Sequence, residues 1–276
     1  MPPGIITLLT DFGLGDPYVG IMKGVILGLN PGVAIVDLTH QIEPGDIVQA
    51  AHVLCHACLF FPPRTIHVAV VDPGVGTGRR PIIVKSQNHF FVGPDNGLFW
   101  LMIKADPQAL IIHLTNEKFF RPQVSHTFHG RDIFAPVAAH LSTGVDPLKM
   151  GDVIGNPVSI PNTVPTREGD TLFGQVIRVD HFGNIITNIH REEMTRFLGD
   201  HQTVIRVGHK RIEGIVQTYG DAAKGELIVL FGSTDHLEIA VNSGRADHRL
   251  NLGESKRLPV IAVDRKSTRL NSSHRL

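Results

Sequence analysis

VVDPGVGTGRR, at residues 70–80, is the stretch around which the rest of the chain is organised. The β-branched and apolar run 66–71 predicts a buried strand that stops at Asp72-Pro73-Gly74. This places the Asp72 carboxylate at the carboxyl end of a strand, the edge where open α/β sheets bind ligands. Arg79 follows across a glycine-rich loop, so a carboxylate and a guanidinium can meet over one pocket. The structural alternative is that Asp72 is only a turn or cap residue.

Strands and helices alternate around this stretch. The first strand also ends on an aspartate, Asp11, and Asp16-Pro17 then supplies an N-cap residue and a proline for the start of a helix. The order strand-helix-strand-helix-strand predicts an N-terminal α/β domain, residues 1–150, with a central, mostly parallel sheet flanked by helices. We expect strands at 5–9, 34–38, 66–71, 81–85, 89–92 and 109–114, and helices from 16 and at 46–60, 98–104 and 133–141.

The pattern changes after residue 150. Residues 151–169 are rich in proline, glycine, asparagine and threonine, and we expect an interdomain linker there. Short strands at regular spacing then predict a smaller all-β, barrel-like domain at 170–263. The last segment, 264–276, reads DRKSTRLNSSHRL and has no apolar period. It resembles translated sequencing-adapter read-through, and we expect an artefactual, disordered tail.

Composition excludes several classes of protein. The chain has 276 residues, of which 42% are hydrophobic and 19% charged, as in ordinary globular proteins. Its formal net charge is zero, and four of its cations lie in the last twelve residues; without them 22 basic residues face 26 acidic ones. No basic face for nucleic acid is expected. No apolar run approaches the roughly 20 residues that span a bilayer, and no signal peptide is recognisable, so we expect a cytoplasmic protein.

The two cysteines, Cys55 and Cys58, form a C-x-x-C flanked by His52 and His56. A metal or redox site is one interpretation. The cysteines also fall on the apolar face of a helix, where a free cysteine packs as a small hydrophobic residue. No second C-x-x-C completes a zinc site, so we expect a structural role and no metal.

Several polar turns are further candidates for a site. Thr127-Phe128-His129-Gly130-Arg131-Asp132 stands ahead of the helix at 133–141, where the helix dipole favours anions. In the second domain, 180–184 and 232–234 are unusual polar turns, and the latter lies ahead of 241–243. A lone histidine near a helix start usually has no catalytic role, so these turns do not identify the chemistry by themselves.

Six motifs taken together resemble one family: TDFG, VVDPGVGT-x-R, GPDNG, FHGRDIFAP, DHFGN and LEIAVN. They are similar to the S-adenosyl-L-methionine (SAM) hydrolases that form adenosine, relatives of the bacterial fluorinase and chlorinase. The resemblance covers about residues 5 to 263. It implies an α/β domain followed by a β domain, and a homotrimer whose ligands lie between the N-terminal domain of one subunit and the C-terminal domain of the next. It also implies hydrolysis of SAM to adenosine and methionine without a cofactor or metal.

The resemblance assigns roles to ten residues. The family's catalytic triad maps onto Asp72, Arg79 and His129. The substrate contacts are Asp11 for the ribose hydroxyls, Asp180 and Ser233 for the methionine part, Phe182 and Asn184 for adenine, and Asn242 and Ser243 at the adenine end. Thr234 stands where the fluorinase has an arginine, which leaves the methionine contacts less defined.

The implied reaction is an in-line displacement at the ribose 5′ carbon by water. A carboxylate about 4 Å from chloride costs on the order of 4 kcal/mol at an effective dielectric of 20, before Arg79 offsets it. Asp72 therefore favours water over a halide. A SAM-dependent halogenase, a non-catalytic SAM- or adenosine-binding protein and a metallohydrolase are the alternatives. A halogenase or a binding protein would use the same substrate pocket as the hydrolase. A metallohydrolase is disfavoured because the sequence has no H-x-H or H-E-x-x-H spacing.

Overall fold

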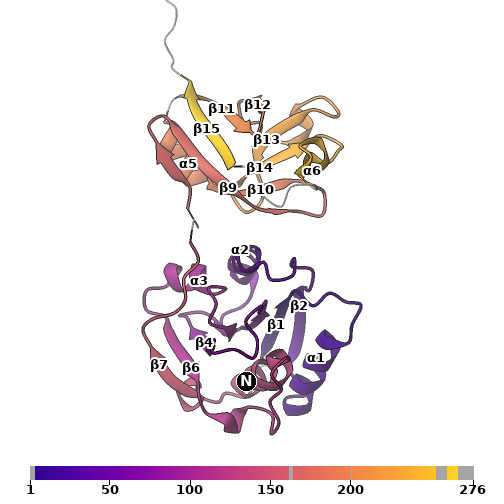
Figure 1. Cartoon of the computed structure of the whole chain (residues 1–276), viewed down its shortest axis with the longest axis vertical. Helices are drawn as coiled ribbons and strands as arrows, with labels where there is room; N and C mark the ends of the chain where they lie inside the picture. The colour runs from indigo at the N-terminus through magenta and orange to yellow at the C-terminus, as the bar shows by residue number, and fades with distance from the viewer. Residues whose placement is uncertain (1–3, 162–163, 200, 253–259, 267–276) are drawn as a thin grey trace, which may run out of the picture. The chain divides into compact units, whose positions relative to one another are not determined.

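The chain divides into two compact units, Met1–Pro161 and Asn162–Leu276. The computed structural model describes residues 4–161, 164–199, 201–252 and 260–266 (Figure 1). Within those ranges, no helix combines the length and the apolar character that crossing a membrane requires.

Unit 1 is built on a seven-stranded sheet in the order β2-β1-β3-β5-β4-β6-β7. Its strands are β1 (Ile5–Thr10), β2 (Ala34–Thr39), β3 (Ile66–Val70), β4 (Pro81–Lys85), β5 (Phe90–Pro94), β6 (Leu110–Leu114) and β7 (Gly151–Ile154). The main helices are α1 (Tyr18–Leu29), α2 (Ile47–Ala57), α3 (Trp100–Ala105) and α4 (Ala135–Ser142), the last preceded by a π-helical turn at Gly130–Phe134.

Two apolar cores lie on the two faces of this sheet. Successive side chains of a strand point to opposite faces, so Val68 and Val70 of β3 join the core under α1 and α4, whereas Ala69 joins the core under α2 and α3. This layered arrangement is the α/β domain that the sequence predicts. It leaves the carboxyl ends of β1 and β3 side by side, because these two strands pair in parallel.

The expectation of a mostly parallel sheet is wrong, because the sheet of unit 1 is mixed. The pairs β1–β2, β1–β3 and β3–β5 are parallel, but β4–β5, β4–β6 and β6–β7 are antiparallel. The physical reason for the β4–β5 pair is the four-residue connection 86–89, in which the Ser86 N–H donates to the His89 carbonyl. So short a connection can only return the chain antiparallel, since a parallel return needs a crossover of a dozen residues or more.

Unit 2 is an antiparallel, barrel-like sheet in the order β12-β11-β15-β9-β10-β14-β13, with β8 paired to β9. Its strands are β8 (Thr166–Glu168), β9 (Thr171–Val179), β10 (Ile185–His190), β11 (Gln202–Val207), β12 (Lys210–Glu213), β13 (Leu227–Phe231), β14 (His236–Val241) and β15 (Val260–Lys266). Helices α5 (Arg191–Leu198) and α6 (Ala246–Arg249) contribute Met194, Phe197 and Ala246 to its apolar core.

The expected linker and the expected C-terminal tail both differ from the structure. The expected linker 151–169 contains β7, which pairs with β6, and β8, which pairs with β9. The expected tail starts inside β15, the yellow strand of Figure 1, which lies between β11 and β9 and occupies the hydrogen-bonding edges of both. There the Asp264 carboxylate accepts hydrogen bonds from Arg206 Nε at 2.6 Å and Thr171 Oγ1 at 2.8 Å. Residues 267–276 lie outside the described residues.

Candidate active site

The loop after β3 brings distant segments of unit 1 together. Asp72 follows the strand, and its carbonyl accepts the Val75 N–H at 3.2 Å, which starts a tight turn. Gly76 has a φ of 75°, and a Cβ there would lie 2.2 Å from the His126 carbonyl oxygen. Only glycine combines this backbone conformation with so close an approach. The contact packs the loop against the segment that leads to His129.

Asp72, Arg79 and His129 form one hydrogen-bonded group. Arg79 Nε donates to both Asp72 oxygens, at 3.0 and 2.8 Å, and Arg79 Nη2 also donates to Asp72 Oδ2. The same Nη2 lies 2.7 Å from His129 Nδ1. The Asp72 and Arg79 side chains are only 4% and 9% exposed, so this ion pair is largely shielded from solvent. The guanidinium also lies 5.3 Å from the centre of the Phe134 ring.

The bond from Arg79 determines the state of His129. A guanidinium can only donate, so Nδ1 must present its lone pair and the neutral ring carries its proton on Nε2. Burial lowers the pKa of His129, and the positive charge of Arg79 lowers it further. His129 is therefore a neutral side chain that can donate a hydrogen bond through Nε2.

A cavity of about 360 Å³ lies over this group. Its lining includes Asp72 and His129 together with Asp11, Phe12, Pro44, Gly45, Thr127, Phe128 and Gly130. Asp11 follows β1, and its Oδ2 accepts the Gly45 N–H at 2.9 Å, which orients the carboxylate. Arg79 is not among the lining residues and reaches the cavity through its two partners. The structure thus places three of the four predicted residues of unit 1 around one cavity, with the fourth directly behind them.

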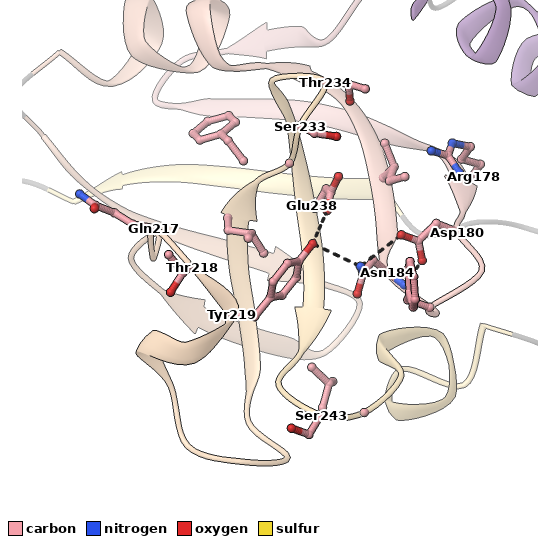
Figure 2. Close-up of a pocket in the computed structure, with 17 residues that line it drawn as sticks. Arg178, Asp180, Asn184, Gln217, Thr218, Tyr219, Ser233, Thr234, Glu238 and Ser243 are labelled. Atoms are coloured by element: carbon pink, nitrogen blue, oxygen red, sulfur yellow. Dashed lines mark hydrogen bonds between the residues drawn. The ribbon is translucent and has the colours of Figure 1, made fainter. Parts of the chain in front are cut away.

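Unit 2 carries a larger cavity, of about 840 Å³, over strands β9, β10, β13 and β14 and the loops beside them (Figure 2). Five of the six residues predicted in this unit line it: Asp180, Phe182, Asn184, Ser233 and Ser243. Asn242 does not, because its amide donates to the Ala222 carbonyl at 2.8 Å and its side-chain oxygen accepts from Ser243 Oγ.

A chain of hydrogen bonds crosses this cavity. Asn184 Nδ2 donates to Asp180 Oδ2 at 3.2 Å and lies 3.4 Å from the Tyr219 hydroxyl, which donates to Glu238 Oε2 at 3.2 Å (Figure 2). Burial raises the pKa of Glu238. Burial and the neighbouring Glu238 charge raise the pKa of Tyr219 to about 12, so Tyr219 remains a hydrogen-bond donor.

Sequence reasoning missed Arg178, Tyr219 and Glu238, which line the same cavity. Arg178 stands two positions before Asp180, a spacing that places two side chains on one side of a strand. Glu238 interrupts an otherwise apolar strand, LEIAV, and a buried acid in such a run is a recognisable signal. Tyr219 lies outside the strands and carries no comparable signal.

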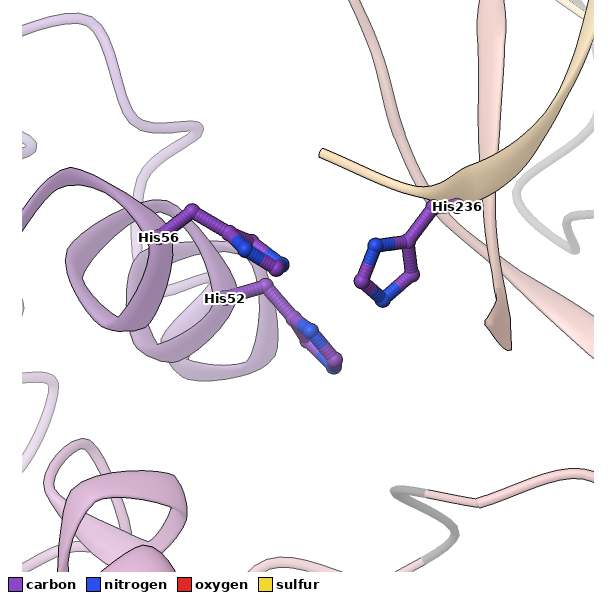
Figure 3. Close-up of side chains that lie close together, drawn as sticks. All are labelled: His52, His56 and His236. Carbon is purple, nitrogen blue, oxygen red and sulfur yellow. The ribbon is translucent and has the colours of Figure 1, made fainter. Parts of the chain in front are cut away.

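The C-x-x-C lies on α2 and its short extension at Cys58–Phe60, and neither cysteine lines the cavity over Asp72 and His129. His52 and His56 stand one turn apart on α2, with ring centres 6.5 Å apart (Figure 3). His236, also drawn in Figure 3, belongs to unit 2. Cys58 Sγ donates to the Cys55 carbonyl at 3.3 Å, and burial raises the pKa of Cys58 to about 12. A thiol in this state is a packing group and a poor nucleophile, as the helix pattern indicates.

Two family models match the chain in order. The SAM hydroxide adenosyltransferase N-terminal domain matches residues 6–151, and the C-terminal domain of the same family matches 174–258. Among curated proteins, the (R)-S-adenosyl-L-methionine hydrolase of Salinispora tropica is 38% identical over 273 residues, covering 95% of this chain and 99% of the relative. The hydrolase of the same name from Thermus thermophilus is also 38% identical, with coverages of 92% and 98%.

More distant and structural matches agree with this. A fluorinase from an Actinoplanes species is 26% identical over 283 residues, covering 90% of this chain and 94% of the relative. A crystal structure of an uncharacterized conserved protein from Thermotoga maritima matches with a TM-score of 0.86 and 39% identity, covering 94% of this chain and all of that one.

Proposed function

This chain belongs to the SAM hydroxide adenosyltransferase family, and we propose that it is an enzyme that hydrolyses SAM to adenosine and L-methionine. The observation that carries the proposal is the hydrogen-bonded group of Asp72, Arg79 and His129 beside a cavity that also contains Asp11. Four curated hydrolases at 37–38% identity over most of the chain support the same activity.

The leaving group of this reaction needs no protonation. A water oxygen forms a bond to the ribose 5′ carbon while the bond from that carbon to the sulfonium sulfur breaks, and the electron pair of that bond stays on sulfur. Methionine leaves as a neutral thioether, and the attacking water loses one proton. The protein must therefore hold substrate and water in line and accept a proton. In-line positioning of a nucleophile can supply roughly 7–11 kcal/mol.

The three residues divide these tasks. Asp72 presents carboxylate lone pairs to the cavity and accepts the proton of the water. Arg79 holds both Asp72 oxygens and the His129 ring in fixed orientations, so it is a positioning residue. His129 directs its Nε2–H toward the water oxygen, because Arg79 occupies Nδ1. We propose that the reaction needs no metal or other cofactor, since no Lewis acid is required to release a thioether.

The substrate contacts are assigned by resemblance. We propose that Asp11 binds the ribose hydroxyls, that Asp180 and Ser233 bind the methionine part, and that Phe182, Asn184 and Ser243 bind adenine. Asn242, assigned to the adenine end, acts by holding Ser243 through the hydrogen bond between their side chains. Phe182 is 71% exposed, which suits a residue that stacks on a ligand.

We also propose a homotrimer in which unit 1 of one subunit and unit 2 of the next complete each site. The resemblance supports this assembly, and light scattering should give three times the 30.2 kDa chain mass. A monomeric mass for active protein would refute it.

A cytoplasmic location is supported by the free thiols of Cys55 and Cys58, since cysteines stay reduced in that compartment.

A halogenase is the second candidate, favoured by the fluorinase relatives at 24–26% identity. Asp72 argues against it, because a buried carboxylate repels a halide but not water. The test is chromatography of purified protein incubated with SAM, with and without excess chloride. Adenosine and methionine in both samples support the hydrolase. A 5′-halogenated adenosine would establish the halogenase, and no product with retained adenosine would indicate a binding protein.

A further inference from the structure

Arg178 is the one cationic side chain among the described residues that line the unit 2 cavity. It is half-buried near the end of β9, and none of the described residues forms a hydrogen bond or an ion pair with its guanidinium. The arginines that flank the unit 1 cavity differ in this respect, since Arg79 and Arg131 are both paired with carboxylates. Burial raises the pKa of Glu238 and the positive charge of Arg178 opposes that rise, so Arg178 acts across the cavity. Because no hydrogen bond or ion pair with the described residues holds the Arg178 guanidinium in this partly apolar cavity, it is available to a ligand of opposite charge.

The sheet register defines what surrounds Arg178. Ile186 of β10 pairs with Arg178 on one side and with Glu238 of β14 on the other, and Glu238 pairs with Leu230 of β13. All four line the cavity and form one row across its floor. Adjacent strands lie about 4.8 Å apart, so the backbones of Arg178 and Glu238 are roughly 10 Å apart. A guanidinium and a carboxylate thus stand at separate places on an apolar floor.

Asp180 supplies a second charge close to Arg178. It lies two positions further along the chain and lines the same cavity (Figure 2). Its two oxygens accept hydrogen bonds from the Asn184 backbone N–H, at 2.8 Å, and from Asn184 Nδ2, which leaves each oxygen a lone pair for a further donor. Arg178 and Asp180 therefore offer adjacent cationic and anionic groups.

This pairing matches one chemical class. The head of an α-amino acid carries an ammonium and a carboxylate on the same carbon, so it needs an anion and a cation side by side. A guanidinium presents a planar fork of N–H donors that suits a carboxylate. Ser233 and Thr234 at the rim can add only single hydroxyl donors, and Glu238 would repel an anion.

We propose that Arg178 binds the α-carboxylate of the amino-acid part of the substrate while Asp180 faces its ammonium, so that the unit 2 cavity selects a zwitterionic tail. The inference rests on the proposed function and adds to it the residue that binds the carboxylate. Thr234 lines the same cavity but carries no charge, so Arg178 supplies the positive charge that the carboxylate needs. Arg178 is thereby a specificity residue.

The test compares SAM with its decarboxylated analogue, which differs only in lacking that carboxylate. A hydrogen bond between charged groups corresponds to a factor of roughly 10–150. Arg178→Gln should lower kcat/KM for SAM by that factor, mostly through KM, and leave the analogue unchanged. Arg178→Lys should lose less. Arg211→Gln, an exposed arginine of β12 outside the cavity, should change neither substrate.

Equal losses on both substrates, or no loss on SAM, would overturn the assignment. Calorimetric binding of L-methionine and of 3-(methylsulfanyl)propylamine to the full chain keeps the test independent of turnover. A preference for methionine that disappears in Arg178→Gln supports the inference even if SAM is not hydrolysed. If that preference is absent from the wild type, Arg178 does not read the carboxylate, whether or not SAM is turned over.

Discussion

Replacing Asp72 with asparagine separates the chemical role of this residue from its structural role. The change keeps the size and one acceptor oxygen of the side chain but removes its negative charge. The Arg79 guanidinium, 9% exposed, then loses its counter-ion and remains buried. Breaking a buried ion pair from one side costs about 3–5 kcal/mol. For a domain of this size each kcal/mol lowers the Tm by about 2–4 °C, so the expected drop is roughly 6–20 °C.

The expected loss of activity is separate from that loss of stability. An amide cannot accept the proton of the attacking water, and positioned general bases contribute about 10²- to 10⁴-fold. We therefore expect kcat at 25 °C to fall by that factor in protein that is still folded. Circular dichroism gives the folded fraction, and chromatography of adenosine gives the rate.

Asp95→Asn is the matched control. Asp95 is 2% exposed and pairs with Arg80, which is 26% exposed, and it also accepts the Val158 N–H at 2.8 Å. It does not line the cavity over the triad. This variant should lose stability of similar size and keep its kcat. If Asp72→Asn retains kcat within twofold, or if Asp95→Asn loses as much activity, Asp72 is not the proton acceptor.

Three further outcomes follow from the geometry. Burial and Arg79 lower the pKa of His129, so the ring stays neutral below the ordinary value of 6.5. We expect kcat/KM to stay level from pH 8 to 6.5 and to decline only at lower pH, and His129→Gln should remove this decline. A decline centred above pH 6.5 would contradict the assignment. Burial lowers the pKa of His67 to about 3, so below pH 6.5 this side chain is protonated in the unfolded chain but stays neutral in the folded chain. His67 should therefore lower the free energy of unfolding by about 2 kcal/mol between pH 6.5 and 5. Urea titrations at both pH values should show that His67→Gln loses this contribution. If wild type and variant lose the same free energy between the two pH values, His67 is not the group responsible. Dialysis against a chelator should leave SAM hydrolysis intact, and activity that is lost and then restored by zinc would refute the metal-free reaction.

Local patterns in the sequence predicted most of the elements and much of the candidate site. Apolar runs ending on Asp11 and Asp72 identified two strand ends, and the structure places both residues at one cavity. Turn residues and helix starts located α1 and α2 to within a few positions. These features depend on residues near one another in the chain, so they can be read without a fold.

Contacts between distant segments were decided by the tertiary structure. The meeting of Arg79 with His129 depends on the packing of Gly76 against His126, a contact between segments that lie far apart in the chain. The mixed sheet arose in the same way. The sequence predicts 81–85 and 89–92 as a strand pair, but not that this pair lies between β3 and β6 in the sheet. Asn242 turned away from the cavity because Ala222, twenty residues earlier, accepts its amide.

The row of Arg178, Ile186, Leu230 and Glu238 shows where sequence ends as a guide in this protein. Each residue lies in a strand that the apolar pattern predicts, and Arg178, Ile186 and Leu230 are by themselves ordinary strand residues. They share one cavity floor because strand register aligns them, and a shift of one residue would turn each side chain to the other face. The sequence by itself determined the strands and the strand-end acids, through local periodicity and turn chemistry. The tertiary structure alone decided which charges face the same cavity, because register is set by hydrogen bonds and packing between segments far apart in the chain.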